Sequence, residues 1–128
     1  MTGVLAVGLD LVEIDRVATL WARHGERAAR RLLTDEEWRY CAGQAEPARH
    51  VAARLAAKEA AFKALAGSSS ARRITWRELE VTRDESCGPA MHFSGRAAER
   101  ARELGVTRTL LSLTHTDRTA AAVVVLVA

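Results

Sequence analysis

The sequence predicts an α+β fold, in which a small, mostly antiparallel sheet packs against one long helix and shorter helices. The alanine-rich stretch 47–66 has the composition and the length of the longest helix. Apolar runs at 3–12 and 119–127 are typical of buried strands. Residues 115–118 separate the last run from a strand at 108–114, which predicts an antiparallel pair.

Capping and turn signals define the shorter elements. Thr34, with Glu37 three residues later, forms a capping box that opens a short helix, and Pro47 suits the first turn of the long one. Gly67 begins a serine-rich loop. The other expected elements are a helix at 13–24 ended by Gly25, strands at 74–81 and 90–93 around a turn at Gly88-Pro89, and a helix capped by Ser94 that stops at Gly105.

Composition narrows the class of protein. The chain has 128 residues, 19 Lys and Arg against 16 Asp and Glu, and 48% hydrophobic residues, as expected of one globular domain spanning 1–128. The run at 3–12 lacks a basic leading region and contains Asp10, so we interpret it as a strand rather than a signal peptide, and we expect a cytoplasmic protein without a membrane partner. Cys41 and Cys87 form no CxxC motif, so buried thiols are expected rather than a zinc site or a disulfide framework.

Two carboxylates stand in apolar settings. Asp10 interrupts the first strand and shares a face with small residues, which leaves room for a group to approach it. Glu59 lies near the centre of a helical stripe formed by Val51, Leu55, Phe62 and Ala66. Each carboxylate needs a partner: Lys63, an arginine or a metal ion. If they share one, Mg²⁺ fits, because it takes one or two protein carboxylates and completes its shell with water and phosphate oxygens. The structural alternative is a Glu59–Lys63 helix pair and an unrelated Asp10.

Three separated segments resemble motifs of the small phosphopantetheinyl transferases. Residues 8–16, GLDLVEIDR, are similar to the family's G-x-D-x-x-x-[IV]-x-R opening. Residues 54–64, RLAAKEAAFKA, are similar to its R-F-A-A-K-E-A-x-x-K-A helix. Residues 112–116, SLTHT, followed by AAAV at 120–123, are similar to its S-x-[ST]-H strand-turn-strand. Order and spacing also agree, and the holo-acyl-carrier-protein synthase group gives the best match.

The resemblance implies a 4′-phosphopantetheinyl transferase-like fold and a Mg²⁺-dependent reaction. In this reaction, 4′-phosphopantetheine passes from coenzyme A, the co-substrate, to a serine of an apo acyl carrier protein, and adenosine 3′,5′-bisphosphate is released. Asp10 and Glu59 would bind the metal, and Lys63 would contact the pyrophosphate and stabilise the leaving phosphate. Glu59 is expected to be essential, either as the base for the serine proton or beside a metal-held water that relays it. The residues expected at the nucleotide end of coenzyme A are Arg54, Lys58, His115 and Thr116. The alternative for His115 is a turn histidine that only caps a strand.

Basic residues on the first helix suggest a binding face. Arg16, Leu20 and Arg23 form a basic stripe with an apolar anchor. Taken alone, such a face is a solvated helix surface or a nucleic-acid footprint. Because relatives bind acidic carrier proteins on this helix, the resemblance favours an acyl carrier protein as the partner and no nucleic acid. The helix is expected to end at Gly25, which leaves two further arginines in doubt: Arg27 and Arg30.

The sequence departs from the family pattern in two places and leaves other points open. Leu55 replaces an aromatic residue, and Gly67 is followed by three serines where relatives have more glycine, which puts loop contacts with the coenzyme in doubt. Relatives of this length form homotrimers with active sites between neighbours, so a homotrimer is expected. The rival class is a non-catalytic basic α+β module that binds nucleic acid or an acidic protein. The acceptor could serve fatty-acid, polyketide or peptide synthesis. The remaining histidines are expected at the surface: His24, His50 and His92.

Overall fold

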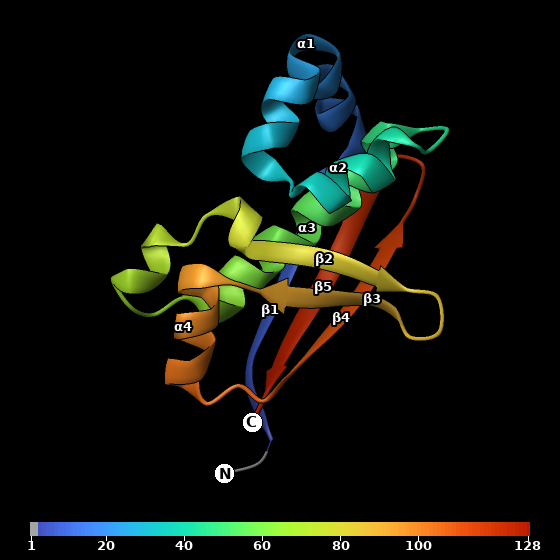
Figure 1. Ribbon diagram of the computed structural model, residues 1–128. Helices are drawn as coiled ribbons and strands as arrows, with labels where there is room; N and C mark the ends of the chain where they lie inside the picture. Colours follow the sequence, from blue (N-terminus) through green and yellow to red (C-terminus); the bar gives the residue numbers. More distant parts are fainter. Residues whose placement is uncertain (1–2) are drawn as a thin grey trace.

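A three-stranded antiparallel sheet and a two-stranded hairpin both lie against one long central helix (Figure 1). The computed structural model describes residues 3–128. Its elements in chain order are β1 (Val4–Glu13), α1 (Ile14–Leu32), α2 (Asp35–Ala42), α3 (Pro47–Leu65), the 3₁₀ helices η1 (Ser70–Arg73) and η2 (Trp76–Glu78), β2 (Leu79–Asp84), β3 (Gly88–Phe93), α4 (Gly95–Leu104), β4 (Arg108–His115) and β5 (Thr119–Val127). The predicted α+β class and the long helix are confirmed.

The larger sheet has the order β1-β5-β4, so the C-terminal strand is central. Its register pairs Gly8 with Val124 and Asp10 with Ala122. Alternate residues of β5 point towards α3, because side chains of a strand alternate between its two faces. These residues are small or aliphatic and fully buried: Ala120, Ala122, Val124 and Leu126. Asp10 therefore lies on an edge strand next to the helix-packed face of the sheet.

Gly8 allows the backbones of β1 and α3 to touch. A Cβ atom at Gly8 would lie 1.8 Å from the carbonyl oxygen of Ala60 and 2.7 Å from its carbonyl carbon. The room that the sequence suggested beside Asp10 on this side is thus filled by the helix. The surface of α3 that makes this approach consists of buried alanines: Ala56, Ala57, Ala60, Ala61 and Ala64.

The stripe of α3 expected to face the core is the less buried one. Of this stripe only Val51 is buried; Leu55, Glu59 and Phe62 are half-buried and Ala66 is exposed, whereas the alanine face is buried. A helix enclosed between two sheets places its smallest residues where the backbones approach most closely. Glu59, predicted to face the core, is therefore only half-buried.

The sequence predicts an end of the first helix at Gly25, and the helical conformation is interrupted there, but α1 continues beyond this residue. Gly25 has φ 37° and ψ −115°, and the chain kinks there before helical structure resumes to Leu32. A positive φ of this kind favours glycine. The two arginines in doubt, Arg27 and Arg30, therefore belong to the second half of α1.

Three further expectations for the central segment need correction. The strand expected at 74–81 begins only at Leu79, because Thr75 and Glu78 form a capping box that winds η2. Ser94 makes no side-chain cap for α4. Glu78 takes that role by accepting a hydrogen bond from the backbone N–H of Arg96. Gly88-Pro89, expected as a turn, begins β3 instead.

One face of the larger sheet carries exposed apolar side chains. On β1, Val7, Leu9 and Leu11 are 59%, 60% and 66% exposed, and Leu110 of β4 is 43% exposed. These β1 residues alternate with Gly8 and Asp10, so they lie on the face opposite α3. Among residues 3–128, no helix has the length and apolar composition needed to span a membrane.

Candidate active site

The structure brings together the side chains of Asp10, Glu59 and Lys63. The Lys63 Nζ atom lies 2.8 Å from Asp10 Oδ1 and 3.2 Å from the carbonyl oxygen of Leu9. Burial raises the pKa of Glu59, the charge of Asp10 raises it further, and Lys63 opposes both effects. Hydrogen bonding to Asp10 raises the pKa of Lys63. The two acids and the lysine thus share one site, which rules out an isolated Glu59–Lys63 helix pair.

The two carboxylates suit a hard divalent cation. Both supply oxygen donors, and their mutual repulsion favours a positive charge between them. In the described part of the chain, no cluster of three or more His, Cys, Asp or Glu side chains could hold a metal. A two-carboxylate donor set leaves most of an octahedral shell to water and phosphate oxygens, as Mg²⁺ requires and Zn²⁺ does not. The residues present therefore fit Mg²⁺ bound together with a phosphate-bearing substrate.

A cavity of about 210 Å³ lies beside Glu59. Apart from Glu59 and Arg72, its walls are apolar: Phe62, Ile74, Trp76 and Leu79. A carboxylate at the edge of an apolar cavity is poorly hydrated, which matches the raised pKa of Glu59. The cavity gives a second group room to reach this carboxylate.

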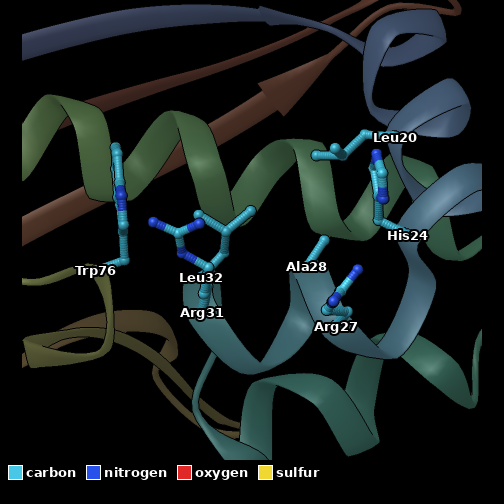
Figure 2. Close-up of a pocket in the computed structure, with 7 residues that line it drawn as sticks. All are labelled: Leu20, His24, Arg27, Ala28, Arg31, Leu32 and Trp76. Atoms are coloured by element: carbon cyan, nitrogen blue, oxygen red, sulfur yellow. The ribbon is translucent and has the colours of Figure 1, made fainter.

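A larger hollow of about 570 Å³ is lined by residues of α1 and by Trp76 of η2, as Figure 2 shows. Leu20 and His24 from the first half of α1 stand on one side, and Trp76 stands on the other. Arg27 and Arg31 come from the second half of α1. Trp76 also lines the cavity beside Glu59, so the hollow adjoins the carboxylate site.

The three predicted partner-binding residues do not line the same hollow. Arg16 lines a second hollow of about 590 Å³, and Leu20 lines both this hollow and the one in Figure 2. Arg23 is exposed and lines neither hollow. Of the two arginines in doubt, Arg27 joins the hollow. Arg30 instead forms an exposed ion pair with Glu26 at 2.9 Å.

Lys58 is buried in the protein interior, which is at odds with the expected contact with coenzyme A. Its side chain is 0% exposed and its Nζ atom lies 2.7 Å from Glu37 Oε1. It also donates hydrogen bonds of 2.8 Å to the carbonyl oxygens of Trp76 and Leu79. These three acceptors use all the protons of the ammonium group. Lys58 therefore fastens α3 to α2, η2 and β2 instead of facing a ligand.

Arg54 lies on the other side of α3 from the carboxylates. Arg54 and Lys63 are nine residues apart, and at about 100° per residue they project from opposite faces of the helix. Arg54 and His115 lie in the same region, because both act on His50. Burial lowers the pKa of His50, and the charges of Arg54 and His115 lower it further. Thr116 closes the β4–β5 turn by accepting hydrogen bonds from the N–H groups of Arg118 and Thr119. One chain thus holds two separate groups of predicted site residues.

Sequence reasoning missed several residues of these groups. The capping box identified Glu37 but gave no sign that its carboxylate also binds Lys58 and the N–H of Val81. The hollow beside Trp76 forms where η2 meets α1, a tertiary contact that the periodicity of the sequence does not reveal. Tyr40 was visible only as an apolar helix residue, although its ring contacts two arginines.

Comparison with known proteins identifies the family. Residues 6–124 match the model of the 4'-phosphopantetheinyl transferase superfamily. The chain is 42% identical over 123 residues to a holo-[acyl-carrier-protein] synthase of Koribacter versatilis, a match that covers 96% of this chain and 98% of the relative. The fold matches the crystal structure of the synthase from Neisseria meningitidis with a TM-score of 0.83 and 27% identity, covering 97% of this chain and 98% of that one. It also matches a Bacillus anthracis synthase in complex with CoA (3',5'-ADP), with a TM-score of 0.77, 25% identity and coverage of 100% and 99%.

The fold and the paired carboxylates define a transferase rather than a basic binding module. The chain belongs to the 4'-phosphopantetheinyl transferase superfamily and is an enzyme of its holo-[acyl-carrier-protein] synthase group. The resemblance found in the sequence is thereby confirmed, and the rival class of non-catalytic module is set aside.

Proposed function

We propose that the protein transfers 4′-phosphopantetheine from coenzyme A to a serine of an apo acyl carrier protein, with Mg²⁺, and releases adenosine 3′,5′-bisphosphate. The observation that carries this proposal is the meeting of Asp10, Glu59 and Lys63 at one point between β1 and α3. Asp10 and Glu59 would hold the metal. When bound, Mg²⁺ supplies positive charge that offsets the charge developing on the pyrophosphate.

The chain's own residues supply the proton transfer and further charge stabilisation. The serine oxygen attacks the phosphorus that carries pantetheine, and the bond from this phosphorus to the bridging oxygen breaks. Glu59, which lines the largely apolar cavity, takes the serine proton. The Lys63 ammonium, held beside Asp10, stabilises the negative charge on the departing phosphate. The electron pair of the broken bond leaves with adenosine 3′,5′-bisphosphate.

The hollows on α1 would receive the carrier protein. Arg16 and Leu20 from the predicted set, with Arg27 and Arg31 from the second half of the helix, present cations around an apolar centre. An acidic partner would be steered to such a face, with an association rate that falls as salt rises. Because Trp76 lines both this hollow and the cavity beside Glu59, a carrier docked here would lie next to the carboxylate site.

A homotrimer would complete the active site. Arg54 and His115 lie on the face of α3 opposite Asp10 and Lys63, so a coenzyme A molecule contacting both groups has to bridge two copies of the chain. The exposed apolar face formed by Val7, Leu9 and Leu11 lies directly behind Asp10 and could bring a second copy to this edge. Analytical ultracentrifugation tests this, since Leu9→Lys is expected to give monomers.

Mass spectrometry of an apo carrier protein tests the function directly. Incubation with this protein, coenzyme A and Mg²⁺ should add one phosphopantetheine mass, and omission of Mg²⁺ or the Glu59→Gln substitution should prevent the addition. Failure of the wild-type protein to modify any carrier from fatty-acid, polyketide and peptide synthesis would refute the proposal. The same panel identifies the natural acceptor. The cytoplasmic location stays a prediction, which cell fractionation tests.

A further inference from the structure

Lys63, the lysine of the proposed transfer, lies in the last turn of α3, two residues before the helix ends at Leu65. A helix leaves its last four carbonyl oxygens without partners in its own ladder, so its final turn frays unless other groups bind them. The backbone provides one such bond, because the N–H of Ala66 donates to the carbonyl oxygen of Lys63 at 3.3 Å. The remaining support for this turn has to come from outside the helix.

An arginine on α4 binds this end of the helix, beside which α4 lies (Figure 1). The Nε–H of Arg100 donates a hydrogen bond of 2.8 Å to the carbonyl oxygen of Leu65, and its Nη2 donates one of 3.1 Å to that of Ala66. The fork of a guanidinium group lets one side chain hold two successive carbonyl oxygens. Its positive charge also interacts favourably with the negative end of the helix dipole. Arg100 thus acts as a side-chain cap for α3.

The guanidinium group is itself held in place. The Arg100 side chain is only 12% exposed, and its Nη1 pairs with Glu103 on the same helix at 3.1 Å. Gly67 passes close to it, since a Cβ atom there would lie 3.3 Å from Nη2 of Arg100. Beyond Gly67, the Ser68 hydroxyl accepts a hydrogen bond of 3.1 Å from the N–H of Ala71. Side chains therefore fasten the chain on both sides of Gly67.

The direction of the Lys63 side chain depends on this last turn. Lys63 is 52% exposed, and within residues 3–128 its ammonium group bonds only to Asp10 Oδ1 and the carbonyl oxygen of Leu9, both on β1. Side chains of a helix leave the axis at about 100° intervals, so unwinding the turn would point this side chain away from β1. Fixing a long side chain also costs conformational entropy, and a frayed backbone adds to that cost.

We infer that Arg100 is a positioning residue: by binding the carbonyl oxygens of Leu65 and Ala66, it keeps the last turn of α3 wound and Lys63 directed at Asp10. The inference rests on the proposed function, because Lys63 has its role only in that transfer. Arg100 lies outside the three segments that resemble the family's motifs. Its loss should slow the chemical step, in which Lys63 stabilises the departing phosphate, and leave binding of the carrier on α1 unchanged.

Steady-state kinetics of matched α4 variants gives the first test. Arg100→Leu should lower kcat by about tenfold and change KM for the carrier less than threefold. Arg102→Leu is the control, because Arg102 lies on the same helix, is exposed and forms no ion pair within residues 3–128. Leucine and arginine have similar helix propensities, so neither substitution unwinds α4. Arg100→Lys, which keeps the charge without the fork, should give an intermediate kcat and replaces Arg100→Leu if that variant does not fold.

A double-mutant cycle separates positioning from a general structural role. Lys63→Gln removes the group that Arg100 positions, so adding Arg100→Leu to it should lower kcat less than twofold, against about tenfold in the wild-type background. Single turnovers with excess enzyme keep the slow variants measurable. Amide hydrogen exchange without substrates should be at least about tenfold faster at Ala66 in Arg100→Leu, and unchanged there in Arg102→Leu.

The outcomes separate this inference from the proposed function. A folded Arg100→Leu protein with the kcat of the wild type would overturn the inference while the transfer stands. Equal losses of kcat in the wild-type and Lys63→Gln backgrounds would also overturn it, because Arg100 would then act by a route other than Lys63. A wild-type protein that modifies no carrier would instead refute the proposed function, and the role of Arg100 with it.

Discussion

Replacing Lys58 by methionine should destabilise the protein without touching the coenzyme. The substitution leaves the buried Glu37 carboxylate without its cation, which lies 2.7 Å away, and two carbonyl oxygens without their donor. Removing one partner of a buried ion pair costs about 3–5 kcal/mol. For a domain whose total stability is about 5–15 kcal/mol, this is a large part of the free energy of unfolding. The expected fall in Tm is roughly 10–20 °C.

Urea unfolding of four proteins separates this role from coenzyme binding. The set comprises the wild type, Lys58→Met, Glu37→Gln and the double variant. Each single variant leaves one buried group unpaired. The loss of stability in the double variant should therefore be about 2 kcal/mol smaller than the sum of the losses in the two single variants. KM for coenzyme A, measured at a temperature where Lys58→Met is folded, should change less than threefold. Unchanged stability with a strongly raised KM would refute the reasoning and restore the nucleotide contact suggested by the sequence.

Three further predictions test other parts of the structure. Gly8→Ala should lower stability by about 3 kcal/mol or more and abolish transfer, because its Cβ would overlap the carbonyl oxygen of Ala60; equal Tm values would contradict this. Burial alone would raise the pKa of Glu78, but backbone hydrogen bonds hold it below its ordinary value of 4.5. Its contribution of about 1 kcal/mol is therefore present above pH 4.5 and lost as pH falls through the folded pKa, so urea unfolding of Glu78→Gln should approach the wild type in acid. Burial raises the pKa of Cys41 to about 11, whereas Cys87, which was also expected to be buried, is exposed; a thiol reagent at pH 8 should therefore modify Cys87 alone until the protein is denatured.

The sequence predicted those elements whose signals are local. The Thr34 capping box, the long α3 helix and the β4–β5 pair follow from neighbouring residues, and the structure contains each of them. The strand expected at 74–81 was too long because the Thr75 capping box, an equally local signal, was overlooked. Gly25 interrupts α1 where the sequence predicts its end, but no local signal predicts that the helix resumes and continues to Leu32.

Tertiary packing decided what the sequence could not. Ionised groups in apolar segments need a partner, which points to Asp10 and Glu59, and Lys63 lies between strand and helix beside Asp10. The same reasoning could not distinguish Lys58 from Lys63, since both stand on α3 near the motif. Only the path of α2 and β2 around the helix buries Lys58. The contact between the Tyr40 ring and Arg83, which lies on a distant strand, likewise cannot be predicted from neighbouring residues.

Binding of a divalent ion tests the central claim, which is that Asp10 and Glu59 form one site. Electron paramagnetic resonance of Mn²⁺, used in place of Mg²⁺, can count bound ions in the presence of coenzyme A. Circular dichroism should show that Asp10→Asn and Glu59→Gln both keep the native fold. The account predicts one ion per chain in the wild-type protein and at least about tenfold weaker binding in each variant. Wild-type affinity in both folded variants would contradict it.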